Sequence, residues 1–115
     1  MLGLVSGETR EIVLNVRNGE AIEDMEPDDV VEIPCQVNRD GAHLARTGRL
    51  PGSVRGLVQS VKAYERTTVA AALRGSRLLA QLALMECPIV GQWELAGEVL
   101  GSLIDNDPVG LGALK

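Results

Sequence analysis

Aromatic residues are almost absent from this chain, whose 115 residues include one Trp, one Tyr and no Phe. Leu, Val, Ile and Ala must therefore fill its core. A hydrophobic share of 45% with a charged share of 23% excludes an intrinsically disordered chain. The longest apolar runs fall well short of the ~20 residues that a membrane span needs, so no membrane partner is expected. The length suits one domain with one modest core.

Basic residues are too few for a nucleic-acid binder. The chain has 11 Lys and Arg against 16 Asp and Glu, which gives a formal net charge of −5. Nucleic-acid binding requires cationic surface that displaces counterions from the phosphates. The composition therefore argues against a nucleic-acid partner.

Histidine and cysteine are scarce as well. The one His, His43, lies in a glycine-bounded loop, where it is either a general base or, as we favour, an ordinary loop histidine. Cys35 and Cys87 are far apart and lack the spacing of a zinc site, so we predict reduced thiols of a cytoplasmic protein without a structural metal. No GxGxxG follows a predicted strand and no GxxxxGK[ST] occurs, so no motif predicts a bound dinucleotide or nucleotide. The residues alone predict a folded domain without an active site.

Two charge blocks stand out among the residues that are present. Residues 18–32 carry seven acids and no base, and residues 36–77 carry eight bases against two acids. The blocks could attract each other within the fold or between subunits, but we favour a solvated acidic loop and a basic helix face. For Tyr64 and Glu65, on a predicted helix, we favour packing and a surface ion pair with Lys62 or Arg66.

Hydrophobic periodicity and turn residues predict an α+β fold in which short strands precede three helices. Residues 1–6 resemble the last turns of a helix that Gly7 stops, and residues 38–52 form a loop with one short strand. Ser53 and Ser76 are the expected helix caps, Gly75 ends the first helix, and a frayed tail follows residue 108. The strands are expected at 11–16 and 29–37, and the helices at 53–74, 76–86 and 92–105.

The same patterns predict which residues form the core. In the second strand, alternation places Val31, Ile33, Cys35 and Val37 on one face. Pro34 lies on the other face and cannot donate to a strand ladder, so we place it at an edge or a bulge. The expected core consists of Val13, Val31, Ile33, Leu57, Val61, Leu79, Leu82, Val99 and Leu103.

Several segments form a distinctive series. The two most specific are Val30–Cys35 (VVEIPC) and Val61–Arg66 (VKAYER). With them come Asn15-Val16, Asn18, Ala21-Ile22, Asp29, Gly41-Ala42, Gly48, Leu50-Pro51, Thr68-Val69, Ala71-Ala72, Ala83-Leu84 and Pro88–Val90. In this order and spacing, over nearly the whole chain, they resemble the C-terminal part of glycoside hydrolase family four, the NAD- and manganese-dependent 6-phospho-β-glucosidases and α-galactosidases. Glu20 departs from that pattern, which has Gly in this turn.

That resemblance implies a fold like the C-terminal domain of lactate and malate dehydrogenases, attached to a Rossmann domain. It implies a parent enzyme of carbohydrate metabolism that hydrolyses O-glycosidic bonds of phosphorylated glycosides by NAD-dependent oxidation and elimination, with Mn2+ stabilising the enediolate. In the family, the dinucleotide turn, the metal-binding Cys and His, the acid and the Tyr base all precede the matched region. Cys35 and His43 are therefore not expected to be those ligands, nor Tyr64 that base.

The resemblance also sets expectations for the chain by itself. Residues 1–115 are expected to be a single, substrate-side C-terminal domain that lacks the Rossmann domain and is inactive alone. Arg10 lies near a family arginine that helps hold the substrate phosphate, which makes it the one substrate-binding candidate. A domain without its Rossmann partner exposes apolar surface, which predicts a homo-oligomer. The alternative is a free-standing oligomerisation or binding module without catalysis.

Overall fold

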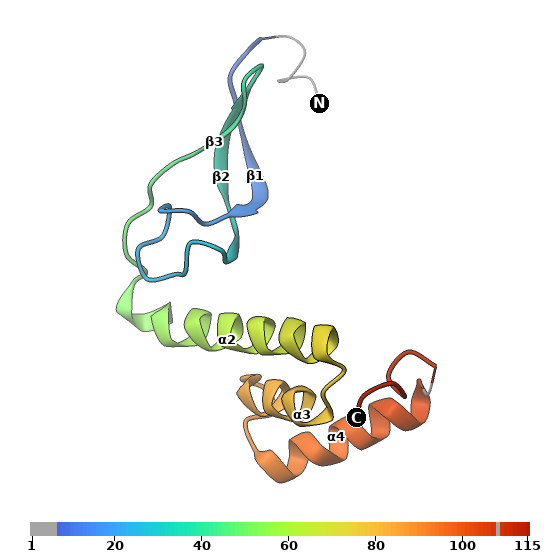
Figure 1. Ribbon diagram of the computed structural model, residues 1–115. Helices are drawn as coiled ribbons and strands as arrows, with labels where there is room; N and C mark the ends of the chain where they lie inside the picture. Colours follow the sequence, from blue (N-terminus) through green and yellow to red (C-terminus); the bar gives the residue numbers. More distant parts are fainter. Residues whose placement is uncertain (1–6, 108) are drawn as a thin grey trace. The chain divides into compact units, whose positions relative to one another are not determined.

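The computed structural model describes residues 7–107 and 109–115, so the helix end expected at residues 1–6 lies outside the described residues. The chain divides into two compact units, Met1–Gly52 and Ser53–Lys115, which we call the sheet unit and the helical unit. Strands precede helices, which confirms the α+β class. The elements, labelled in Figure 1, are β1 (Arg10–Arg17), β2 (Val30–Asn38), β3 (Gly41–Leu44), α2 (Gly52–Arg74), α3 (Arg77–Glu86) and α4 (Trp93–Asn106).

β2 is the central strand of the sheet and pairs antiparallel with both β1 and β3. The four-residue β3 confirms the short strand expected after β2. Pro34 lies opposite Val13 of β1, but β3 ends at Leu44, opposite Cys35. Pro34 therefore has a neighbouring strand on one side only, which agrees with the predicted edge position because its missing N–H interrupts no ladder toward β3.

The core of the sheet unit lies on one face of β2, as the alternation predicts. From β1, the residues that pack on this core are Ile12, Leu14 and Val16, which are partly buried. The prediction of Val13 as a core residue is wrong, because Val13 is 56% exposed. The register places Val13 opposite Pro34 on the outer face of the sheet. The buried members of the cluster are Ala21, Val31, Ile33, Cys35 and Val37.

The helix boundaries follow local signals, with one exception. α2 begins at Gly52, so Ser53 lies inside the helix and is not the predicted cap. Gly75, after the last residue of α2, has φ +60°, the left-handed conformation that favours glycine. Ser76 then caps α3 as predicted, because its Oγ accepts a hydrogen bond from the Leu79 N–H at 3.3 Å. Within the described ranges, no helix is long and apolar enough to cross a membrane.

Small side chains line the contacts of the helical unit. Ala71 of α2, Ala83 of α3 and Ala96 of α4 are buried, with Leu100 of α4 as the one large buried apolar side chain described in this unit. A Cβ added at Gly97 of α4 would lie 2.9 Å from the side-chain nitrogen of Gln81 on α3, so a larger residue there would displace Gln81. Ala83, Ala96 and Gly97 let the backbones of α3 and α4 approach closely.

Two helical residues predicted for the core are exposed. Leu57 of α2 is 59% exposed and Leu103 of α4 is 46% exposed, so the prediction is wrong for both. For Leu57 the reason is length: α2 has 23 residues and α3 has 10, so α3 can cover only about half the length of α2. The remaining helical residues of the predicted core are partly buried: Val61, Leu79, Leu82 and Val99.

The glycine-rich tail is attached to the connection between α2 and α3, so the prediction of a frayed tail is wrong. The Lys115 N–H donates to the Gly75 carbonyl at 2.8 Å, and the Arg77 N–H donates to the Lys115 carbonyl at 2.8 Å. Within the tail, the Leu114 N–H donates to the Leu111 carbonyl at 3.1 Å. Backbone hydrogen bonds to a helix connection hold the tail in place, which its glycine content did not suggest.

Candidate functional site

The turn between β1 and β2 is organised around a buried asparagine. Asn18 is 1% exposed, and its backbone N–H donates to the Asp29 carbonyl at 2.7 Å. Its side-chain oxygen accepts the Ile22 N–H at 2.9 Å. Its side-chain nitrogen lies within hydrogen-bond distance of the carbonyls of Ile22 (3.0 Å), Met25 (3.3 Å) and Glu26 (3.3 Å). One amide side chain thus supplies the partners that the turn backbone lacks.

Glycine at position 19 makes this turn possible. Gly19 has φ +56°, and in the part of the chain that the structure describes every positive φ belongs to a glycine. Glu20, which stands where the family pattern has Gly, therefore does not adopt the left-handed conformation. The departure from the family pattern causes no backbone strain, because Gly19 takes the left-handed position.

The segment that leads into α2 lies beside this turn in a constant register. Residues 46–50 contact residues 20–24 at a sequence separation of 26. Ile22 and Gly48 form a parallel bridge, and the Thr47 backbone N–H and hydroxyl both donate to the Ala21 carbonyl at 2.8 Å. We call residues 46–50 the strap. The strap also donates the Leu50 N–H to the Asp24 carboxylate at 2.8 Å.

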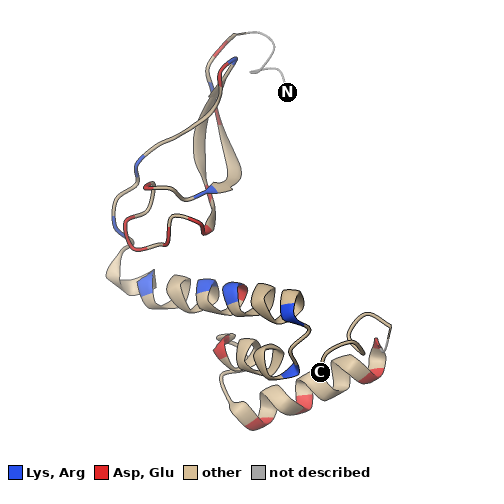
Figure 2. Cartoon of the chain, viewed as in Figure 1, with Lys and Arg blue, Asp and Glu red and all other residues tan. Residues whose placement is uncertain are grey.

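Ion pairs accompany these backbone contacts. Arg46 pairs with Glu20, and Arg49 pairs with Glu23 at 3.1 Å. Both pairs are 60% exposed or more, so each contributes at most about 1 kcal/mol. Attraction between the charge blocks within the fold, one of the two possibilities raised by the sequence, therefore occurs here. Figure 2 marks acidic positions on the loop after β1 and basic positions on the neighbouring segment that leads into α2.

A hollow of about 340 Å3 opens beside the turn and the strap. Its charged groups are the guanidinium of Arg46 and the carboxylates of Glu20 and Glu23, and Arg46 is already paired with Glu20. No imidazole, thiol or hydroxyl is among the lining residues, so the hollow has no nucleophile with an adjacent base. The lining residues are Gly19, Glu20, Ile22, Glu23, Met25, Pro27, Arg46 and Gly48.

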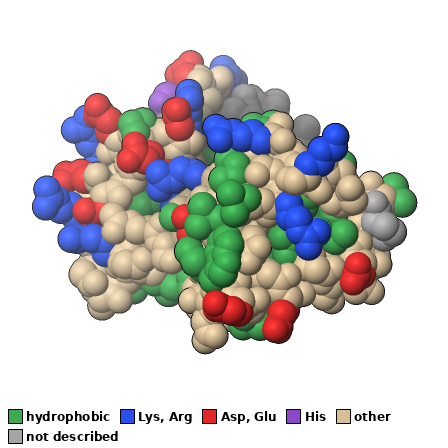
Figure 3. Space-filling view, turned by 60° about the horizontal axis from the view of Figure 1, so that its bottom comes forward, with side chains coloured by type: hydrophobic (Ala, Val, Ile, Leu, Met, Phe, Trp, Pro, Cys, Tyr) green, Lys and Arg blue, Asp and Glu red, His purple; other side chains and the backbone are tan. Residues whose placement is uncertain are grey.

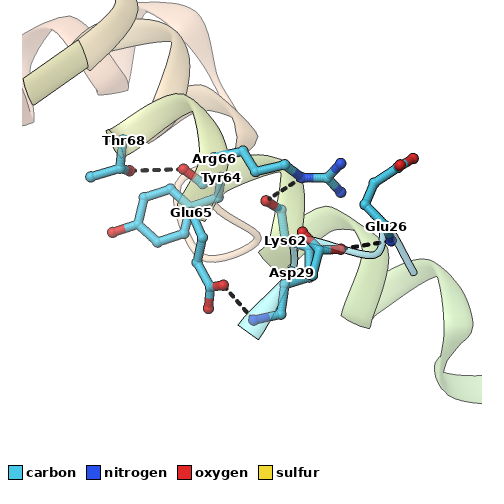
Figure 4. A network of polar contacts seen from close by, with 7 residues as sticks. All are labelled: Glu26, Asp29, Lys62, Tyr64, Glu65, Arg66 and Thr68. Atoms are coloured by element: carbon cyan, nitrogen blue, oxygen red, sulfur yellow. Dashed lines mark hydrogen bonds and ion pairs between the residues drawn. The ribbon is translucent and has the colours of Figure 1, made fainter. Parts of the chain in front are cut away.

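A second hollow, of about 220 Å3, lies within the helical unit. Most of its lining is alanine and leucine from α2, α3, α4 and the tail, and its polar side chains are Tyr64 and Thr68. The Thr68 hydroxyl donates to the Tyr64 carbonyl at 2.8 Å, as Figure 4 shows. Other large apolar side chains of this unit reach the surface, where Figure 3 shows hydrophobic groups on the face in view. This hollow is mostly apolar, and it offers no charged group for a phosphate.

The structure places the candidate residues from the sequence apart from any shared site. Arg10 is the first residue of β1 and pairs with Glu8 at 3.1 Å, with its side chain 50% exposed. His43 lies on β3 and is exposed, with its ring Nε2 3.2 Å from the Asn38 side-chain oxygen. The expected loop position is wrong because His43 belongs to β3, but this surface contact agrees with the interpretation of an ordinary histidine.

The charged residues around Tyr64 make local contacts on α2. Lys62 pairs with Glu65 at 2.5 Å, which decides between the two partners expected for Glu65. The Arg66 side chain instead donates to the Lys62 carbonyl at 3.2 Å, and Figure 4 shows both contacts. Tyr64 itself is partly buried and lines the second hollow. The packing and ion-pair interpretation of these residues is confirmed.

Both cysteines are free thiols in different environments. Cys35 is 1% exposed in the core of the sheet unit, with its sulfur 3.5 Å from the Ile33 carbonyl. Cys87 follows α3 and is partly exposed. Over residues 7–107 and 109–115, no group of three or more His, Cys, Asp or Glu side chains could hold a metal ion.

Thiol labelling should distinguish the two cysteines. In the folded protein we expect Cys87 to react first and Cys35 to react only when the sheet unit opens, because burial protects the Cys35 sulfur. Purified protein should contain no stoichiometric zinc or manganese. Two thiols that react at one common rate, or a full equivalent of either metal, would contradict this prediction.

Reasoning from the sequence missed the residues that organise the turn. Asn18-Gly19 was recognisable as a turn signal, but nothing local shows that the Asn18 side chain is buried. The contacts of Arg46 and Arg49 with acids 26 positions earlier are long-range and have no local signal. The only indication of these contacts in the sequence is that a block of acidic residues is followed by a block of basic residues.

Comparison with known families gives a match over most of the chain. The model of the family 4 glycosyl hydrolase C-terminal domain matches residues 1–90. The probable 6-phospho-β-glucosidase of Bacillus subtilis is 35% identical over 92 residues, which are 80% of this chain and 21% of that protein. The phospho-α-glucosidase of Clostridium acetobutylicum is 33% identical over 102 residues, 88% of this chain and 23% of that protein. The chain thus spans about a fifth to a quarter of the length of these relatives.

Solved structures show the same similarity in three dimensions. A 6-phospho-α-glucosidase from gut microorganisms, in complex with NAD and glucose-6-phosphate, matches 98% of this chain with a TM-score of 0.86 and 27% identity, over 25% of its own length. The 6-phospho-β-glucosidase of Thermotoga maritima, with manganese, NAD+ and glucose-6-phosphate, matches 94% of this chain and 26% of its own length, with a TM-score of 0.84 and 30% identity. In sequence and in fold, the chain belongs to the C-terminal domain family of the family 4 glycosyl hydrolases.

Proposed function

We propose that this chain is the substrate-side C-terminal domain of a 6-phospho-glycosidase. In the complete protein it would form one wall of the cleft that receives a phosphorylated glycoside. The observation that carries the proposal is the match of 98% of the chain to part of a 6-phospho-α-glucosidase solved with NAD and glucose-6-phosphate. The matches to 6-phospho-β-glucosidases support the same substrate class, with the β-glucoside as our first expectation.

NAD and manganese, which accompany the related structures, do not fit the described residues of this chain. Those residues include no group of three metal-binding side chains, and the sequence has no glycine-rich dinucleotide turn after a strand. The oxidation and elimination implied by the family are therefore assigned to the complete protein. The part we assign to this chain is to bind and enclose the sugar phosphate, and we expect the chain alone to be inactive.

Arg10 is the residue that we propose for the substrate phosphate. Its side chain lies at the start of β1 and is half exposed. Its ion pair with Glu8 is a surface contact that contributes at most about 1 kcal/mol, so a phosphate can replace or share it. A guanidinium can bind two phosphate oxygens at once, which suits it to this role.

We further propose that the complete protein works in the cytoplasm as a homo-oligomer. Two free thiols agree with a reducing compartment. Exposed large apolar side chains, among them Leu73 at 83% and Ile89 at 91%, support a partner surface. A two-fold dimer is the commonest such arrangement.

A domain exchange tests the proposal. This chain would replace the matching C-terminal region of the Thermotoga maritima 6-phospho-β-glucosidase. We expect the chimera to hydrolyse a chromogenic 6-phospho-β-glucoside in the presence of NAD+, Mn2+ and reductant. The retained part of the Thermotoga maritima enzyme supplies the sites for NAD and manganese that this chain lacks. The 115-residue chain alone should give no turnover above background. Turnover by the chain alone, or a folded chimera without any activity, would contradict the proposal, and the second result would favour a free-standing binding module.

The chimera also tests Arg10. Arg10→Ala should raise the KM for the 6-phospho-glucoside about tenfold, because a charge-assisted hydrogen bond to phosphate is lost. Arg74→Ala, which removes an arginine from the last turn of α2, is the matched control and should leave KM unchanged. An unchanged KM in the Arg10 variant would remove Arg10 from the site.

A further inference from the structure

β1 forms an open edge of the sheet. It has eight residues and contains no proline, and among the residues that the structure describes only β2 pairs with it. Figure 1 shows β1 at one side of the sheet with β2 and β3 beyond it. Every second residue of an edge strand directs its N–H and C=O away from the sheet, and such groups pair readily with another strand. β3, at the opposite edge, has only four residues and offers a much shorter ladder.

The order of residues along β1 suits a second copy of itself. Two identical strands pair antiparallel about a two-fold axis perpendicular to the sheet, which keeps the core faces of both copies on the same side. The sequence numbers of two residues that lie opposite each other then add up to twice the number of the residue on the axis. With the axis at Leu14, Glu11 lies opposite Arg17 of the other copy, twice per dimer. Ile12 then lies opposite Val16, and Leu14 opposite itself.

Moving the axis by one residue loses this complementarity. With the axis at Val13, Glu11 faces Asn15 and the charged Arg10 faces Val16, an apolar residue of the core face. Opposite charges across an antiparallel pair stabilise it, and the axis at Leu14 leaves no like charges directly opposite. The charge pattern of β1 therefore selects the register centred on Leu14.

We propose that β1 pairs with β1 of a second copy of this chain, antiparallel about a two-fold axis at Leu14. This inference rests on the self-association proposed above and names the residues that form its interface. The interface extends the three-stranded sheet across both copies. Ile12, Leu14 and Val16, which are only partly buried in one copy, join their counterparts on a continuous core face. Arg17 already contacts Asp28 at 2.5 Å, and its guanidinium has enough donors to bind Glu11 of the other copy as well.

Charge reversal tests this interface, with sedimentation equilibrium of the full chain as the measurement. We expect wild type to form a dimer of twice 12.2 kDa. Glu11→Arg and Arg17→Glu should each raise the dimer dissociation constant about tenfold. Each variant places like charges opposite each other at both of the contacts between positions 11 and 17 in the dimer. The double variant Glu11→Arg/Arg17→Glu restores opposite charges and should return the dissociation constant close to that of wild type.

The controls separate the interface from folding and from self-association in general. Asp40→Arg reverses one charge in the turn between β2 and β3, on the far side of β2 from β1, and should leave the dissociation constant unchanged. Circular dichroism checks that every variant is folded. A wild-type chain that stays monomeric overturns both this interface and the proposed oligomer. A dimer that single reversals do not weaken, or that the double reversal does not restore, overturns the β1 interface alone. Neither result bears on the glycosidase proposal.

Discussion

Replacing Asn18 with alanine is expected to lower the free energy of unfolding of the sheet unit by about 3 kcal/mol. The substitution leaves the Ile22 N–H and the Met25 carbonyl without their partner in a turn that excludes water from Asn18, and it removes one of the two donors to the Glu26 carbonyl. A buried polar group that loses its hydrogen bond costs about 1–3 kcal/mol. Because several groups lose a partner together, the whole turn is expected to loosen.

The distribution of aromatic residues makes this effect measurable in each unit separately. Tyr64 and Trp93 both belong to the helical unit, and residues 1–52 contain no aromatic residue. Amide hydrogen exchange in β2 therefore reports the sheet unit, and tryptophan fluorescence reports the helical unit. Asn15→Ala, on the exposed face of β1, is the matched control and should change stability by less than about 0.5 kcal/mol. Equal effects of the two variants would show that Asn18 does not organise the turn.

Replacing Leu100 with alanine is expected to cost the helical unit about 2–5 kcal/mol. Leu100 is 3% exposed on α4, and its side chain lines the apolar hollow of about 220 Å3. The deletion enlarges a space that is already present, and the penalty of such substitutions grows with the cavity that remains. Urea unfolding followed by Trp93 fluorescence measures the loss.

The matched control for Leu100 lies on α2. Leu73→Ala makes the same substitution at a residue that is 83% exposed, where alanine also favours the helix. We expect its unfolding midpoint to stay within experimental error of wild type. If Leu73→Ala destabilises the unit as much as Leu100→Ala, then Leu73 is covered by a partner in solution and the exposed surface is an interface.

Local patterns predicted the elements of this fold well. Alternation in β2 identified its buried face because a strand with one face on a core needs an apolar residue at every second position. Gly75 and Ser76 located the break between α2 and α3, since the left-handed turn and the N-cap each require particular residue types. The order of strands and helices then followed from these elements.

Burial on the other elements was harder to predict. β1 is apolar on both faces, with Val13 on one and Ile12 and Leu14 on the other, so its own pattern does not say which face is covered. The pairing of Val13 with Pro34 decides this, because it orients β1 on the sheet. Leu57 and Leu103 fit the helical periodicity, but periodicity does not reveal how far a neighbouring helix extends.

The sequence by itself determined the α+β class, the succession of strands and helices, the buried face of β2 and the family to which the chain belongs, because each depends on short patterns along the chain. Only the tertiary structure decided that Asn18 is buried, that the strap at residues 46–50 lies beside residues 20–24, and that the tail joins the connection after α2. These contacts link residues far apart in the sequence. Their stability comes from satisfying backbone groups that the local turns leave unpaired, and no local pattern records which distant residue supplies the partner.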